Sequence, residues 1–213
     1  HAAEAVDSAR ARQVAAIARI NGARALEALG HGDEAVAAAK EHGLTEAVER
    51  QRAFDAGQAR YAEGLAHFEA KRFEEAGEAF QTSLATFETL GEPALAAMAR
   101  KGKAWSTFNQ ALAMPPADGR RLFIMVRRDA ETLGDPELEA RAGVGVALTK
   151  AKLGHADAAQ ALREAAAAAE AMGLDNQAGH CWAEVVATPA PLEERVLAAR
   201  RAYELLGGDD QDG

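Results

Sequence analysis

Residues that commonly carry chemistry are present in this chain, but their spacing favours no catalytic or metal site. None of the six histidines pairs with another at metal-ligand spacing beside a carboxylate or thiol. The one imidazole next to a thiol is His180, beside Cys181, and adjacent helical residues point about 100° apart. We predict that Cys181 is a buried small hydrophobe; a nucleophile with a base from elsewhere in the fold is the alternative.

A glycine-rich segment, Gly143-Val144-Gly145, resembles the start of a phosphate-binding loop. It lacks a third glycine, a following lysine and a preceding strand, and it lies inside a helical unit. These glycines are therefore predicted to be close-packing positions. Carboxylates are abundant, but amphipathic helices usually place them on the solvent face, and no acid–base pair can be nominated. The sequence predicts a non-catalytic protein with no metal and no cofactor.

The composition points to an all-helical protein. Hydrophobic residues make up 48% of the 213 residues and aromatic residues only 5%, because alanine, the best helix former, supplies most of the apolar fraction. No stretch alternates with the period of two that a half-buried strand requires. The net charge of −9 disfavours nucleic acid as a partner, and no apolar run reaches the roughly 20 residues needed to cross a bilayer.

The single cysteine indicates a reducing compartment, and we expect a cytoplasmic protein. The chain begins with His1 instead of Met, which we interpret as a piece of a longer protein. A signal, an anchor or a catalytic domain removed from its start is compatible with that interpretation.

The strongest signal is an internal repeat of about 40 residues. Ala-Arg pairs recur along the chain, and a small residue follows each Ala by five positions: Ala18 with Ala23, Ala59 with Gly64, Ala99 with Ala104, Ala140 with Gly145, and, in a degenerate fifth copy, Ala178 with Ala183. Glycines that suit a left-handed helix end fall between them, at Gly43, Gly91, Gly134 and Gly173. Short connections of this kind force neighbouring helices to be antiparallel. We predict a single repeat domain over 1–206, with five helix pairs at about 8–42, 45–90, 93–133, 136–172 and 175–206. The acidic segment 207–213 is predicted to be a disordered tail.

The second unit resembles a tetratricopeptide repeat. Gly64, Phe68, Phe73, Ala76 and Phe80 fall where that family places its small and aromatic packing residues. The period near 41 exceeds the usual 34 and is similar to longer variants in bacterial signalling and transcription regulators. The resemblance implies an α-solenoid, a right-handed superhelix whose first helices line a concave groove for a peptide or a partner helix.

By the family pattern, the groove-facing residues lie at fixed positions in the first helix of each unit. These positions are Gln58, Tyr61, Leu65 and Phe68 in the second unit; Met98, Lys101, Trp105 and Phe108, with Asn109 beside them, in the third; and Arg24, Glu139, Val146, Thr149, Lys150 and His180 in the others. The proposed site is Tyr61, Leu65, Lys101, Trp105, Asn109, Arg24 and His180. Aromatics beside a cation are typical of interface hot spots, although aromatics at helical spacing are also typical of a core. We predict that Phe68 and Phe108, at equivalent positions, belong to the core.

A second candidate surface is basic. Four arginines, Arg120, Arg121, Arg127 and Arg128, share one face of the helix predicted over 116–133, with Ile124 between them and Met125 beside them. Leu122, Phe123, Val126 and Ala130 occupy the opposite face, which should pack inward. The arginine stripe could dock an acidic helix or tail, or it could be a solvated face whose arginine stems cover apolar surface.

These observations predict a scaffold that binds a protein or peptide partner. The alternatives are a sensor domain of a bacterial signalling or transcription regulator, a helical non-catalytic domain of a larger enzyme, and a self-assembling structural array. A terminal helix with an exposed apolar face would favour homo-oligomers, and Val196, Leu197, Ala199, Tyr203 and Leu206 lie on the last helix.

Overall fold

The computed structural model describes residues 2–41 and 43–207 and is all-helical over these ranges. His1 and the tail residues 208–213 lie outside the described residues. The described chain forms ten helices: α1 (Ala2–Ala28), α2 (Gly32–Glu41), α3 (Thr45–Glu69), α4 (Phe73–Leu90), α5 (Pro93–Ala113), α6 (Pro116–Leu133), α7 (Pro136–Lys152), α8 (Ala158–Ala171), α9 (Asp175–Ala187) and α10 (Leu192–Leu206). The first helix begins six residues before its predicted start, whereas the other helices match the predicted pairs closely.

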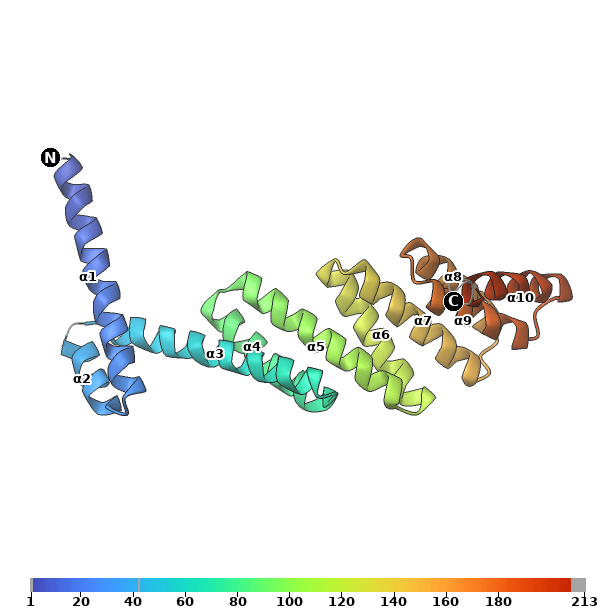
Figure 1. The fold of residues 1–213 in the computed structure, drawn as a ribbon, viewed down its shortest axis with the longest axis horizontal. Coiled ribbons are helices and arrows are strands. Elements are labelled where there is room, and N and C mark those ends of the chain that lie inside the picture. Colours follow the sequence, from blue (N-terminus) through green and yellow to red (C-terminus); the bar gives the residue numbers. More distant parts are fainter. Residues whose placement is uncertain (1, 42, 208–213) are drawn as a thin grey trace.

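The helices stack in chain order into an elongated, solenoid-like array, with α1 and α2 at one end and α9 and α10 at the other (Figure 1). Each helix packs against the next one along the chain. Odd-numbered helices also contact the next odd-numbered helix, whereas no two even-numbered helices come within 8 Å between Cα atoms in the described part. The odd helices therefore form one layer and the even helices a second, separated one. The predicted all-α solenoid of helix pairs is confirmed.

The helix ends follow the predicted capping chemistry. Gly43, Gly91, Gly134 and Gly173 all have φ between 62° and 69°, the left-handed conformation that costs glycine nothing. The tight turn of the second unit has no glycine, and Lys71 takes the same conformation there, with φ 59°.

Close packing of large even-helix side chains on odd-helix glycines organises the array. The Phe80 ring of α4 lies against Gly64 of α3 and Gly102 of α5, so that a Cβ on either glycine would come within 2.8 Å of it. The Phe123 ring of α6 lies against Gly145 of α7 in the same way, at 2.6 Å. Gly145 is thus the close-packing position that the sequence predicted. Gly143 is not, because a Cβ there would meet nothing within 4 Å.

The core is divided into clusters along the array. Val48, near the start of α3, packs with Ala23, Ala35 and Ala39 of the first helix pair. From Phe54 onward, α3 joins a different cluster, in which the Phe54 ring packs edge-on against Phe87 with ring centroids 5.9 Å apart. One long helix therefore links the first pair to the rest of the array.

The glycine contacts predict opposite effects for two substitutions in one helix. Gly145→Ala should lower the free energy of unfolding by about 1–3 kcal/mol, because the new methyl group overlaps the Phe123 ring. Gly143→Ala should raise it by about 0.8–1 kcal/mol, because alanine is the better helix former and the space is open. Urea unfolding followed by circular dichroism measures both. Equal effects of the two substitutions would contradict the packing role of Gly145.

Candidate interaction groove

Two adjoining cavities lie around α5 and share Met98, a half-exposed side chain. One cavity, of about 260 Å³, lies between α3 and α5 and is lined by Gln58, Tyr61, Phe87, Leu95 and Met98. The other, of about 360 Å³, lies between α5 and the α6–α7 connection and is lined by Ala97, Met98, Lys101, Leu133, Gly134, Asp135 and Pro136. Both cavities are lined mainly by apolar residues, and we call the pair of cavities the Met98 groove.

Of the two predicted site residues on α3, Tyr61 lines the Met98 groove and Leu65 does not. Tyr61 is half-buried, and its ring packs edge-on against Phe80 with centroids 5.3 Å apart. It therefore contributes to the core and to the groove wall at once. Leu65 is 44% exposed, one turn further along α3.

Lys101 is not a free cation, because it forms an ion pair with the residue that caps α7. Its Nζ lies 2.8 Å from Oδ2 of Asp135, whose side chain is only 10% exposed. The other carboxylate oxygen, Oδ1, accepts a hydrogen bond from the Leu138 backbone N–H at 3.1 Å, as an N-cap should. The pair therefore joins α5 to the start of α7 across one wall of the Met98 groove.

The electrostatics of this pair follow from its contacts. Burial works to raise the pKa of Asp135, but hydrogen bonds from Lys101, the Leu138 backbone and Trp105, with the charge of Lys101, bring that pKa below its usual value. The hydrogen bond to Asp135 and the charge of its carboxylate raise the pKa of Lys101 in turn. Both groups are therefore charged at neutral pH.

Trp105 lies next to this pair and is half-buried. Its ring packs edge-on against Phe108 at 5.8 Å, and the guanidinium carbon of Arg141 on α7 lies 6.0 Å from its centroid. Asn109, one turn on, turns its amide back to the helix and donates to the Trp105 carbonyl oxygen at 2.8 Å. Trp105 thus helps to fasten α7 onto α5 while leaving part of its ring accessible.

The two remaining site residues lie on other helices. Arg24, on α1, forms an ion pair with Asp55 of α3 at 3.0 Å, and His180 is exposed on α9. Neither α1 nor α9 contributes a described residue to the two cavities that share Met98. The structure therefore places Tyr61 and Lys101 in the two cavities that share Met98, and Trp105 beside the Lys101–Asp135 pair. The other predicted site residues, Leu65, Asn109, Arg24 and His180, line neither cavity.

Of the two phenylalanines predicted for the core, Phe108 packs against a buried cluster, and Phe68 packs against another half-buried ring. Phe108 is half-buried against the α5–α6–α7 cluster and contacts Phe123 edge-on at 5.5 Å. Phe68 is half-buried against Phe73 at 5.4 Å, across the α3–α4 turn. Both aromatic contacts join the two helices of one unit.

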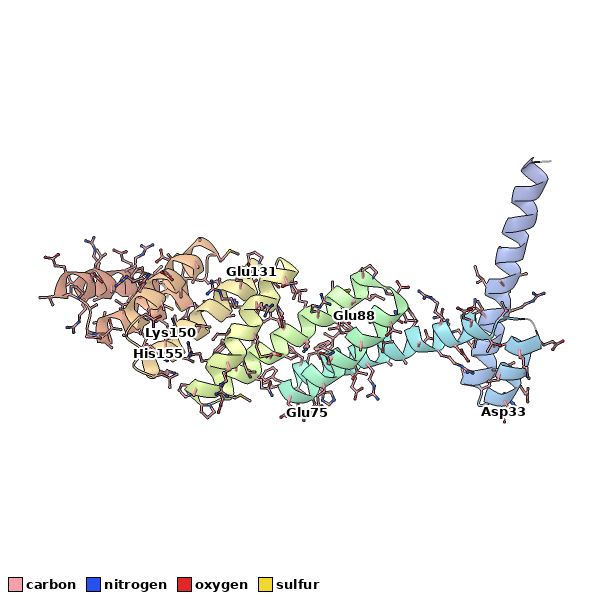
Figure 2. The ribbon with its side chains drawn as sticks, turned by 180° about the vertical axis from the view of Figure 1, so that it is seen from behind. Asp33, Glu75, Glu88, Glu131, Lys150 and His155 are labelled. Atoms are coloured by element: carbon pink, nitrogen blue, oxygen red, sulfur yellow. The ribbon has the colours of Figure 1, made fainter. Side chains whose placement is uncertain are left out.

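In the fourth unit, the predicted groove residues face a different cavity. Glu139, Val146 and Lys150 line a space of about 400 Å³ with α8 residues and with Arg127 of α6 (Lys150 is labelled in Figure 2). Thr149 is buried, and its hydroxyl donates to the Gly145 carbonyl oxygen at 2.8 Å, so the prediction that it faces the groove is wrong. The reason is a change of partner. Gly64 packs on the even helix of its own unit, whereas Gly145, its counterpart, packs on the even helix of the preceding unit.

The arginine face of α6 has the predicted orientation. Phe123, Val126 and Ala130 are buried, and Leu122 is half-buried on the same side. Arg121, Arg127, Arg128 and Ile124 are exposed, and Arg120 is half-buried. Arg127 approaches Glu139 of α7, with Nε 3.9 Å from Oε1. The stripe is therefore a real surface feature.

Cys181 is fully buried in the α7–α10 cluster, as predicted, whereas its neighbour His180 is exposed. Burial is the main cause that raises the pKa of its thiol to about 12, and the charge of Glu184 adds to it. The described residues contain no group of three or more His, Cys, Asp or Glu placed to hold a metal ion. They also contain no helix with both the length and the apolar character needed to span a bilayer.

No protein-family model matches this sequence, and no curated protein matches it either.

Two substitutions of Asp135 separate the stability that its capping oxygen contributes from the stability that its charge contributes. Asp135→Ala should lower the free energy of unfolding by about 1–2 kcal/mol at neutral pH, because α7 loses its N-cap. Asp135→Asn keeps a capping oxygen and should cost less. Because the folded pKa of Asp135 is lowered, its charge stabilises the fold above the unfolded value, about 3.9, and this contribution is lost as pH falls through the folded value.

The measurement is urea unfolding of the wild type and Asp135→Asn at pH 7 and at about pH 3, with the gap between them expected to shrink on acidification. The control is Glu131→Gln on the exposed side of α6 (labelled in Figure 2), which should change stability by less than about 0.5 kcal/mol. A gap that is the same at both pH values would contradict the charge contribution of Asp135.

Cys181 should resist thiol reagents in the folded protein. A buried thiol whose pKa is about 12 has almost no thiolate at pH 8, so Ellman's reagent should report no free thiol until urea unfolds the chain. The readout is the reaction rate against urea concentration. Rapid labelling without urea would show that the α7–α10 cluster opens readily or that the thiol is activated.

Proposed function

We propose that this protein is an interaction scaffold whose Met98 groove binds a peptide or helix of a partner protein. The observation that carries the proposal is the meeting of two cavities at Met98, which joins Tyr61 on one side to Lys101 on the other. A methionine at the centre of a groove suits this role, because its flexible thioether adapts to different apolar partners.

The lining defines the chemistry of the partner. Tyr61, Leu95, Met98 and Leu133 supply apolar walls, and the Lys101–Asp135 pair supplies one fixed polar edge. Such a surface fits a segment that inserts two apolar side chains, as an amphipathic helix does at successive turns. The rigid helices on both sides limit the ordering cost of binding.

We also infer that the units are of the tetratricopeptide type and that the protein works in the cytoplasm. The packing of Phe80 between Gly64 and Gly102 supports the first inference, since that family places small residues opposite aromatic ones. The lone cysteine, buried as a free thiol, supports the second.

A sensor role is the second candidate, and the cavity between α7 and α8 favours it. Its lining combines alanines and Gly143 with the charged residues Arg127, Glu139, Lys150 and Glu164 from three successive helices. A small polar ligand held there would bridge two units and could alter the curvature of the array.

The test compares two methionines of similar exposure on different surfaces. Met98 in the groove and Met125 beside the arginine stripe are 49% and 56% exposed, so neither substitution by glutamate should disturb the fold. Helical peptides selected from a display library on the intact protein should lose at least about tenfold in affinity for Met98→Glu, or roughly 1.4 kcal/mol, and keep their affinity for Met125→Glu.

The reverse pattern would overturn the groove and point to the arginine stripe. Loss of affinity with neither variant would remove both surfaces. Tyr61→Ala and Trp105→Ala are less suitable probes, because each ring also packs against a core phenylalanine.

A further inference from the structure

The even-numbered helices share a register of core positions that is counted back from the glycine after each helix. The helices α4, α6 and α8 are followed by Gly91, Gly134 and Gly173, and in each helix the residues 4, 8, 11 and 15 positions before that glycine are buried. These residues are Phe87, Ser83, Phe80 and Ala76 in α4; Ala130, Val126, Phe123 and Gly119 in α6; and Ala169, Ala165, Leu162 and Ala158 in α8. In α2, the residues 4 and 8 positions before Gly43, Ala39 and Ala35, are buried as well. This register marks the stripe that faces the odd helices.

In the last helix, α10, the residues at the same positions before the following glycine are exposed to solvent instead of buried. Its ending, Tyr203-Glu204-Leu205-Leu206-Gly207, repeats the pattern of Phe87-Glu88-Thr89-Leu90-Gly91. The corresponding positions before Gly207 are Tyr203, Ala199, Val196 and Leu192, and all four are exposed, with Tyr203 at 79%, Val196 at 61% and Leu192 at 73%. The helix instead buries Ala198 and Ala202. We call the exposed set the α10 stripe.

In the inner even helices α4 and α6, residues at these positions are covered by odd helices that carry small residues. The next odd helix places Gly102 on Phe80 after α4, and Gly145 on Phe123 after α6. Even helices never cover one another in the described part of the chain. The complement of the α10 stripe is therefore an odd-type helix with a face of small residues.

The first helix has such a face, and none of the described residues covers it. Val14, Ala18, Gly22 and Ala25 lie on one side of α1 at helical spacing and are exposed, and a Cβ at Gly22 would meet nothing within 4 Å. Ala18 belongs to the Ala-Arg marker, as does Ala99, which is buried in the α3–α5 cluster. Figure 1 places α1 and α10 at opposite ends of the molecule, so they cannot meet within one chain.

We propose that the α10 stripe docks on the small-residue face of α1 in a second copy of this chain. The contact continues the even-to-odd stacking that already joins α2 to α3, α4 to α5, α6 to α7 and α8 to α9. It is a head-to-tail contact between two different surfaces, so repeated contacts build an open chain or a closed ring. It uses neither Met98 nor the arginine stripe, and it therefore stands independently of the proposed groove.

The test uses the whole chain and two variants that each damage one end. Tyr203→Glu places a charge in the α10 stripe, and Ala18→Glu places one on the α1 face; both sites are exposed, and glutamate is a good helix former. Sedimentation velocity over a wide concentration range should show the wild type assembling and each variant alone as a monomer. An equimolar mixture of the two variants should form a 1:1 dimer and nothing larger, because only one intact end of each kind remains per pair.

The matched control is Leu197→Glu, a substitution on another face of α10 where the side chain is 68% exposed. It should assemble as the wild type does. A wild type that stays monomeric at every concentration would overturn the proposal, and so would loss of assembly in Leu197→Glu. If Ala18→Glu alone still dimerises while Tyr203→Glu does not, α10 pairs with α10 and the head-to-tail contact is wrong. Because an unfolded variant could not complement its partner, formation of the mixed dimer also confirms that both variants are folded.

Discussion

The fit between aromatic rings of even helices and glycines of odd helices is the constraint on which this array depends. Phe80 can reach both Gly64 and Gly102 only because neither residue has a side chain, and Phe123 reaches Gly145 for the same reason. Elsewhere the core consists largely of alanine, which lets helices approach closely but supplies little apolar area per residue. The few large side chains therefore fix the spacing and rotation of the helices, and the alanines fill what remains.

The sequence predicts the helices and their ends well because these depend on local chemistry. Asp135 caps α7 and Pro136 opens it, as expected from residues at the start of a helix, and the left-handed glycines end helices where predicted. The inward face of α6 follows from the period of its apolar residues. Such features need no knowledge of which helix lies opposite.

The candidate site is less predictable, because it depends on partners distant in the sequence. Lys101 is a groove residue by position, but only the structure shows that it forms an ion pair with Asp135, in the α6–α7 connection. Val146 has the repeat position of Trp105, yet it lines a cavity with α8 because Gly145 meets the preceding even helix. A repeat pattern predicts which face of a helix is exposed only if equivalent positions meet equivalent neighbours, and Gly64 and Gly145 do not.

The long helix α3 has a consequence for how the array loses its structure. Its first turns belong to the small alanine cluster of α1 and α2, and its later turns belong to the aromatic cluster of α4 and α5. In a quasi-one-dimensional protein, each unit is held only by its neighbours, so the least apolar block separates at the lowest free energy. The first helix pair can therefore detach while the second half of α3 remains in place. The array would then shorten from its amino-terminal end as a cooperative segment, without general melting.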